Sequence, residues 1–294
     1  MSLLHEPNPL PTHHPKTEQA TLLCTTTAET SSLFLTSSHP SDDPSFEYYY
    51  KQYYLDSSYN TPSNYSTYLS SSLKLISNFP SNTTQLFHKQ LLSKTQSLPF
   101  TPYKKTLILD MDETLIHADV DYKFKYHDTI LKFKYQDDET GNDEEEINIP
   151  LILRPHLFDF LNIVSQQYEL ILFTASEKAY ADAIVDYIEK ERKYFNKRLY
   201  RDSCLYLNPG LYIKDLSIFD NRKLEDIVIV DNSIFCFANN ISNGILISSF
   251  YNDENDDMLM NVVNYLGMLC QCTDVREENR KYFRFEEFLK DMKE

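Results

Sequence analysis

Short apolar runs alternate with helical patterns from residue 106 onward. The three clearest runs are 106–109, 169–173 and 227–230, which are too short for helices and rich in strand-forming residues. Weaker runs near 199–206 and at 244–247 predict two further strands. Strands that alternate with helices indicate an α/β fold with a doubly wound parallel sheet.

The segments between these runs predict helices and one insertion. Helical patterns cover 157–164 and about 177–193, the second with Ser176 as its expected N-cap. Residues 123–126 and 130–135 alternate apolar and basic side chains, which is typical of strands. We therefore expect a small β insertion after the first strand.

Polar residues end three of the predicted strands. Asp110 follows the first strand, Thr174 follows the second, and Asp231 follows the run at 227–230. Ligands of doubly wound sheets bind beyond the carboxyl ends of the strands. We expect these three side chains to meet at one edge of the sheet.

Composition divides the chain near residue 100. The first 100 residues contain 31 Ser and Thr, nine of the 13 Pro, and no Gly or Arg. Polar tracts of this kind cannot bury enough apolar surface to offset the entropy of ordering, so 1–65 is predicted to be a disordered Ser/Thr/Tyr-rich tail. We expect residues 66–100 to form a helical lead-in and residues 101–272 to form the main domain. Residues 273–294 are predicted to be an amphipathic helix that docks on that domain.

Charge and cysteine content exclude several classes of protein. The formal net charge of −16 argues against a broad nucleic-acid surface. No apolar run approaches the roughly 20 residues of a membrane-spanning helix, so no membrane insertion is expected. The five cysteines lack a zinc-binding spacing and are predicted to be free thiols in a reducing compartment.

The candidate chemistry starts at Asp110-Met-Asp112-Glu-Thr, directly after the first strand. Alone, two carboxylates so spaced serve equally well in a turn or a helix cap. Their company in order along the chain, Thr174, Lys214 and the pair Asp231-Asn232, favours a catalytic reading.

These motifs resemble the haloacid dehalogenase superfamily of aspartyl phosphatases, and within it the small phosphatases that act on the carboxy-terminal domain of RNA polymerase II. The blocks that carry the resemblance are 107–117 (LILDMDETLIH), 154–156 (RPH), 172–176 (LFTAS), 180–182 (YAD), 201–204 (RDSC), 212–217 (YIKDLS) and 230–233 (VDNS). The resemblance covers about 103–270 and makes 101–272 a phosphatase domain with a haloacid dehalogenase-like fold.

The resemblance implies a role for each residue. Asp110 would be the nucleophile that forms an aspartyl-phosphate, and Asp112 the general acid and then base. Mg²⁺ would be held by Asp110, the backbone carbonyl of Asp112 and Asn232, with Asp231 beside these ligands. The implied phosphate- and substrate-binding residues are Thr174, Ala175, Lys214 and Arg201. An alternative for Arg201 is a structural salt bridge with Asp202 or Asp215.

Three hypotheses about function follow. The first is a Mg²⁺-dependent protein serine/threonine phosphatase, monomeric and nuclear or cytoplasmic, whose phosphoprotein substrate has the RNA polymerase II carboxy-terminal domain as a candidate. The second is a small-metabolite phosphatase on the same scaffold. The third is a non-catalytic phosphatase-like binding or translocase component.

Overall fold

The computed structural model describes residues 62–79, 83–135, 145–207 and 211–291. The tail predicted over 1–65 therefore lies almost entirely outside the described residues. Within the described ranges, no helix has both the length and the apolar character needed to cross a bilayer.

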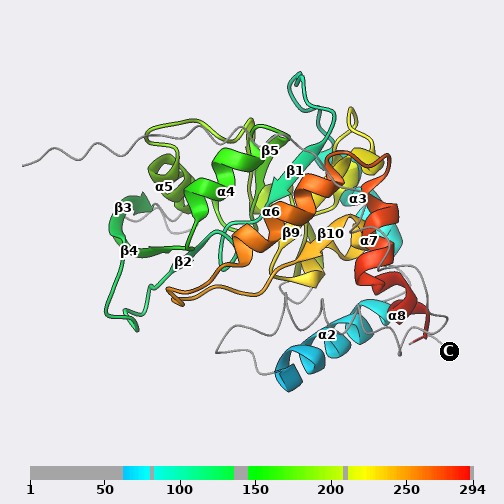
Figure 1. The fold of residues 1–294 in the computed structure, drawn as a ribbon, viewed down its shortest axis with the longest axis horizontal. Coiled ribbons are helices and arrows are strands. Elements are labelled where there is room, and N and C mark those ends of the chain that lie inside the picture. Colours follow the sequence, from blue (N-terminus) through cyan, green and yellow to red (C-terminus); the bar gives the residue numbers. More distant parts are fainter. Residues whose placement is uncertain (1–61, 80–82, 136–144, 208–210, 292–294) are drawn as a thin grey trace, which may run out of the picture. The chain divides into compact units, whose positions relative to one another are not determined.

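A five-stranded parallel sheet forms the centre of the fold (Figure 1). In spatial order its strands are β10 (Gly244–Leu246), β9 (Ile227–Asp231), β1 (Thr106–Leu109), β5 (Glu169–Phe173) and β6 (Lys197–Leu199). Leu109 pairs with both Leu172 and Val230, so β1, β5 and β9 end level with one another. The predicted doubly wound parallel sheet is confirmed.

The two faces of the sheet bury different hydrophobic clusters because successive strand side chains point to opposite sides. Leu107 and Leu109 of β1 join a cluster covered by the helices of one side, whereas Ile108 joins the other cluster. The first side carries α4 (Leu157–Val164), α5 (Lys178–Ile188), α6 (Met258–Leu269) and α7 (Val275–Phe283). The second side carries α2 (Pro62–Ser77), α8 (Phe285–Asp291) and the short helices η2 (Leu216–Ile218) and η4 (Ile234–Asn243).

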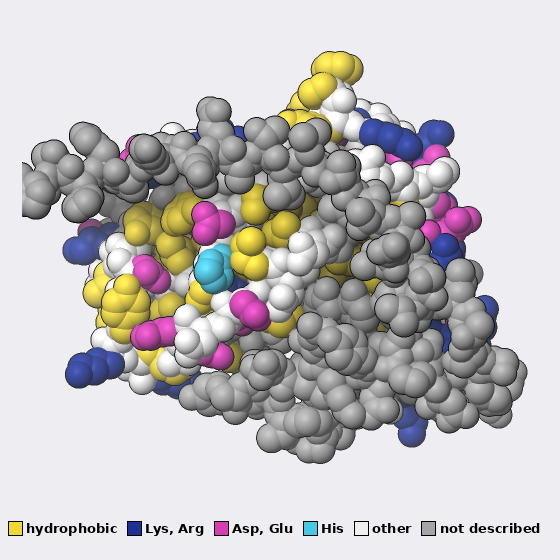
Figure 2. Space-filling model, in the orientation of Figure 1, with side chains coloured by type: hydrophobic (Ala, Val, Ile, Leu, Met, Phe, Trp, Pro, Cys, Tyr) yellow, Lys and Arg dark blue, Asp and Glu magenta, His cyan; other side chains and the backbone are white. Residues whose placement is uncertain are grey.

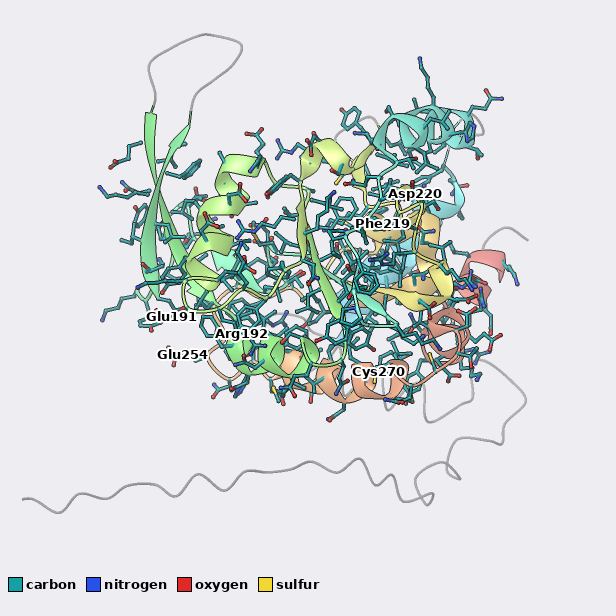
Figure 3. All side chains as sticks on the ribbon, turned by 90° about the horizontal axis from the view of Figure 1, so that it is seen from above. Glu191, Arg192, Phe219, Asp220, Glu254 and Cys270 are labelled. Atoms are coloured by element: carbon teal, nitrogen blue, oxygen red, sulfur yellow. The ribbon has the colours of Figure 1, made fainter. Side chains whose placement is uncertain are left out.

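Outside the insertion, the remaining elements of the described residues are one helix, two short 3₁₀-helices and a β-hairpin. They are α3 (Thr83–Lys94), η1 (Arg201–Ser203), η3 (Leu224–Asp226) and the hairpin β7 (Leu205–Leu207) with β8 (Leu211–Ile213). The residues expected as one strand near 199–206 are thus split between β6 and β7, with η1 separating them. The segment after α3 pairs with the main body, since Ser97 Oγ donates to Asp220 Oδ1 at 2.6 Å; Asp220 is labelled in Figure 3.

A small antiparallel sheet follows β1, as the sequence predicted. Its order is β2 (Ile116–Ala118), β4 (Glu145–Leu153) and β3 (Thr129–Tyr135), and Figure 3 shows the β3–β4 pair at one side of the main sheet. The strand expected at 123–126 is a loop instead. The Asp119 carboxylate accepts the backbone N–H groups of Lys123 and Phe124, both at 2.8 Å, which folds the chain back before it can extend.

The C-terminal segment differs from the single helix expected over 273–294. Arg284 has φ 54°, in the left-handed region, and separates α7 from α8. Phe283 and Phe285 stack at 5.5 Å across the break, and Phe285 is buried in the second cluster. Burial of both rings therefore favours a turn over a continuous helix.

Arg154 ties the insertion, β1 and α6 together from a fully buried position. Its guanidinium forms two hydrogen bonds to Asp256, at 2.7 and 2.8 Å, and donates to Thr114 O at 3.0 Å and Ser248 Oγ at 3.2 Å. The Arg154 side chain is 0% exposed and that of Asp256 is 3% exposed, so the charge of Asp256 is balanced by Arg154 and not by water.

We predict that Arg154→Met destabilises the fold by about 3–5 kcal/mol, because the Asp256 carboxylate would be left buried without a cation. The measurement is urea unfolding followed by circular dichroism. Arg280→Met is the control, since its pair with Glu286 is exposed and is expected to contribute less than about 1 kcal/mol. Equal losses from the two variants would contradict the prediction.

Candidate active site

Asp110 lies at the carboxyl end of β1, where its backbone N–H donates to Val230 O at 3.0 Å. One carboxylate oxygen, Oδ1, is 2.5 Å from Lys214 Nζ, and the other accepts a hydrogen bond from Thr114 Oγ1 at 2.7 Å. The Asp110 side chain retains 8% exposure. The carboxylate is therefore fixed in place while still open to a ligand.

Lys214 follows β8 and is the cation at the centre of the site. Its Nζ also lies 2.7 Å from Asp231 Oδ2, and the side chain is 1% exposed. Burial alone would lower the pKa of Lys214, but the charges of Asp110 and Asp231 outweigh it and raise that pKa well above its ordinary value. Lys214 therefore stays charged between two carboxylates.

Asp231 ends β9 and completes this buried trio. Its Oδ1 accepts the backbone N–H of Ser233 at 2.8 Å. Burial, then the charge of Asp110, raises the pKa of Asp231 above its ordinary value in spite of Lys214. With Lys214 already holding its second carboxylate oxygen, Asp231 acts as a support for the cation.

Asp112 receives hydrogen bonds from hydroxyl groups. Tyr180 Oη donates to Oδ1 at 2.6 Å, Ser176 Oγ to Oδ2 at 2.7 Å, and Thr174 Oγ1 approaches Oδ2 at 3.4 Å. Burial and the negative charge of Asp110 raise the pKa of Asp112 to about 6, against the lowering effect of the Tyr180 and Ser176 hydrogen bonds. This carboxyl group can hold or release a proton near neutral pH.

Ser176 was predicted as a helix cap, but the structure places it elsewhere. The N-cap of α5 is Glu177, and the Ser176 hydroxyl is used on Asp112 while its backbone N–H donates to Thr174 Oγ1 at 3.0 Å. Tyr180 lies one helical turn beyond Ser176, so both hydroxyls reach the same carboxylate. Ser176 and Tyr180 are four residues apart and closely follow Thr174. This spacing is the sequence signal that could have predicted both as partners of Asp112.

Asn232 lies next to Asp231 and faces the same site. Its Nδ2 donates to Ser249 Oγ at 3.0 Å, which orients Oδ1 toward Thr114 Oγ1 at 3.4 Å. The same Thr114 hydroxyl contacts Asp110 Oδ2. One hydroxyl thus touches an amide oxygen and a carboxylate oxygen of the predicted metal site.

The donor set fits Mg²⁺, a hard cation that prefers oxygen ligands and keeps several waters. Asp110 and Asn232 supply oxygens around Thr114, and the backbone carbonyl of Asp112 accepts no hydrogen bond from the described residues. In the described part of the chain, no group of three His, Cys, Asp or Glu side chains is arranged to hold a metal. The residues present fit the predicted mixed set of one carboxylate, one amide and one carbonyl oxygen.

Arg201 is the first residue of η1, and its side chain is half-buried. Its Nε donates to Ala175 O at 2.7 Å, and its Nη1 pairs with Glu177 at 2.8 Å. The ion pair in the structure is thus with Glu177, and not with Asp202 or Asp215, the partners predicted as the alternative. Arg201 therefore braces the segment that follows β5, with the Ala175 carbonyl turned toward it.

A residue from outside the predicted set also reaches the site. Tyr68, on α2, forms side-chain hydrogen bonds with Ser233 and Ser72. Ser233 directly follows Asn232. No motif in the sequence marks Tyr68, because its position depends on how α2 packs against η4.

Comparison with known proteins places the domain. The family model of NLI interacting factor-like phosphatases matches residues 105–276, more than half of the chain. The chain belongs to this family. The match confirms the resemblance drawn from the motifs and covers every strand of the main sheet.

The family members that the chain resembles differ in size. It is 35% identical over 212 residues to "CTD small phosphatase-like protein 2" of Dictyostelium discoideum, covering 69% of this chain and 35% of that protein. It is 36% identical over 180 residues to "CTD nuclear envelope phosphatase 1" of Xenopus tropicalis, covering 59% and 70% respectively. The chain thus spans about a third of the first relative's length.

Among solved structures, the RNA polymerase II CTD phosphatase Fcp1 of fission yeast gives a TM-score of 0.42 at 20% identity, covering 72% of this chain and 59% of that chain.

We predict that Lys214→Met destabilises the protein by about 3–5 kcal/mol, because Asp110 and Asp231 would be left as neighbouring buried carboxylates. The measurement is urea unfolding in the presence of a chelator. Asp231→Asn in the Lys214→Met background should recover part of this loss, since it removes one of the two unpaired charges. A double variant that is less stable than Lys214→Met would contradict the prediction.

Proposed function

We propose that the protein is a Mg²⁺-dependent phosphatase that hydrolyses phosphoserine and phosphothreonine in proteins through an aspartyl-phosphate. The observation that supports it most is the position of Asp110, whose carboxylate lies 2.5 Å from buried Lys214 and joins Asn232 through the Thr114 hydroxyl. A nucleophile, a cation and oxygen ligands thus surround one point at the end of β1.

Asp110 attacks the phosphorus and the serine oxygen leaves, which divides a very slow hydrolysis into two easier steps. Lys214 and the Thr174 hydroxyl bind the nonbridging phosphoryl oxygens as charge builds on them. A Mg²⁺ held by Asp110, the Asp112 carbonyl and Asn232 would supply further charge neutralisation.

Asp112 gives its proton to the leaving oxygen and then accepts one from the water that attacks the aspartyl-phosphate. Its raised pKa supports this role, because a fraction of the carboxyl groups is protonated near neutral pH. Tyr180 and Ser176 hold the carboxyl in one orientation. Asp112 therefore has both a proton to give and a fixed direction in which to give it.

A protein substrate is supported by the kinds of relative that the chain matches, two of which carry "CTD" phosphatase names. In the described residues, the insertion between β1 and α4 forms the three-stranded sheet β2-β4-β3. An insertion of this kind is small for a closed lid, and we take it to leave the site open to a polypeptide. The RNA polymerase II carboxy-terminal domain is one candidate substrate. Monomeric state and nuclear or cytoplasmic location stay predictions.

The first test is hydrolysis of an aryl phosphate and of phosphoserine peptides by the purified chain with Mg²⁺. We expect Asp110→Asn to abolish both activities, and chelation to abolish them reversibly. Asn232→Ala should raise the Mg²⁺ concentration needed for half-maximal rate, because one metal ligand is lost. Full activity of Asp110→Asn, or of the chelated protein, would contradict the proposal; faster turnover of sugar phosphates than of phosphopeptides would favour a metabolite phosphatase.

The second test separates the role of Asp112 from that of Asp110. We expect Asp112→Asn to lower kcat/KM by about 10²–10⁴-fold for phosphoserine peptides, whose alkoxide leaving group needs a proton. The loss should be smaller for p-nitrophenyl phosphate, because nitrophenolate leaves without one. Equal losses on the two substrates would show that Asp112 is not the general acid.

A further inference from the structure

A groove with a volume of about 630 Å³ lies between the insertion and the loop that follows β10. The insertion contributes Phe124 and Tyr126, and the loop contributes Phe250, Asp253 and Glu254. The phosphoryl chemistry proposed above uses none of these side chains. The groove is therefore a separate feature that needs its own explanation.

Two hydrogen bonds join the wall of this groove to the candidate active site. The backbone N–H of Phe250 donates to Glu113 O at 2.7 Å, directly after Asp112. The side chain of Ser249, one residue before Phe250, accepts from Asn232 at 3.0 Å. The loop that forms one wall of the groove is therefore hydrogen-bonded to two segments of the candidate site, at Glu113 and at Asn232.

The lining combines an apolar floor with acidic groups. Phe250 is buried, Phe124 is half-buried and Tyr126 is 62% exposed, so their rings offer surface for a large apolar side chain. Asp253 and Glu254 line the groove together with Asp128, and Lys125 is the one basic residue among its described lining. Figure 2 shows hydrophobic side chains interleaved with Asp and Glu over β2 and β4, with Lys and Arg at the margin.

The acidic residues of the groove favour a segment that carries a positive charge. Asp128 already accepts hydrogen bonds from the backbone N–H of Leu153 at 2.7 Å and from Tyr126 Oη at 3.2 Å. Asp253 accepts one from the backbone N–H of Asn255 at 3.0 Å, whereas the Glu254 side chain is exposed to a cation in solution. The whole chain carries −16, so a phosphorylated segment without basic residues is repelled as it approaches. Lys or Arg in the same segment offsets this repulsion.

We propose that this groove binds the part of the phosphoprotein substrate next to the phosphorylated residue, and that it selects Lys or Arg beside a large apolar residue. The cation meets Glu254, and the apolar side chain packs on Tyr126, Phe124 and Phe250. The inference rests on the proposed function and adds a substrate class to it.

The test compares three short phosphoserine peptides that differ in one pair of residues: Lys-Leu, Gln-Leu and Lys-Ser. The pair is moved stepwise along both sides of the phosphoserine. At the best position and low salt, we expect kcat/KM for Lys-Leu to exceed that for either other peptide by about fivefold or more. The preference over Gln-Leu should shrink as salt is raised.

Variants assign the preference to the groove. Glu254→Lys should remove the preference for Lys-Leu over Gln-Leu, and Tyr126→Ala should reduce the preference for Lys-Leu over Lys-Ser. Both should hydrolyse p-nitrophenyl phosphate at the rate of the unaltered protein. Glu191→Lys is the control, because it makes the same charge change at an exposed residue outside the groove lining; both glutamates are labelled in Figure 3.

Each outcome decides one of the two proposals. Equal kcat/KM for the three peptides, or a Glu254→Lys result equal to that of Glu191→Lys, overturns the groove inference and leaves the phosphatase proposal standing. Lys-Leu peptide that binds at the groove without a gain in kcat/KM shows a partner-docking surface and also overturns it. Failure to hydrolyse any phosphate ester overturns the proposed function, and fluorescence anisotropy of the same peptides on Asp110→Asn then tests the groove by itself.

Discussion

The buried ammonium of Lys214 is the interaction on which the site depends. Asp110 and Asp231 end neighbouring strands, β1 and β9, and both carboxylates are almost fully removed from water. Without a cation between them, their repulsion and their loss of hydration would oppose the register of the sheet. Lys214, at 2.5 and 2.7 Å from them, offsets this repulsion with a positive charge that both groups share.

The same arrangement sets two carboxyl groups to different tasks. Asp110 is held by a cation and a hydroxyl, which suits an ionised nucleophile. Asp112 lies two residues later and accepts hydrogen bonds from the hydroxyl groups of Tyr180 and Ser176, and its pKa is raised to about 6. Environments that separate two neighbouring carboxyl groups in this way are typical of sites that need both a nucleophile and a proton donor.

The sequence predicted what depends on strand ends, and it missed what depends on side-chain direction. Parallel pairing brings the ends of β1, β5 and β9 together whatever surrounds them, so the meeting of Asp110, Thr174 and Asp231 could be foreseen. Serine is a residue type favoured at helix N-caps, which explains the prediction for Ser176. Its hydroxyl instead contacts Asp112, and that direction depends on tertiary packing. The alternating pattern at 123–126 predicted a strand, but the Asp119 carboxylate binds the backbone N–H groups there and holds the segment as a loop.

The loop of Asn232 and Ser233 contacts two other segments, and one of them lies outside the family match. Ser249, after β10, orients its amide, and Tyr68 of α2 binds the neighbouring Ser233. Residue 68 precedes the matched segment 105–276. Because Leu69 and Leu73 of α2 are buried in the same cluster as η4, the helix is part of the packing behind this loop. Helix α2 therefore packs behind the loop that carries Asn232 and Ser233, although it lies outside the segment that matches the family model.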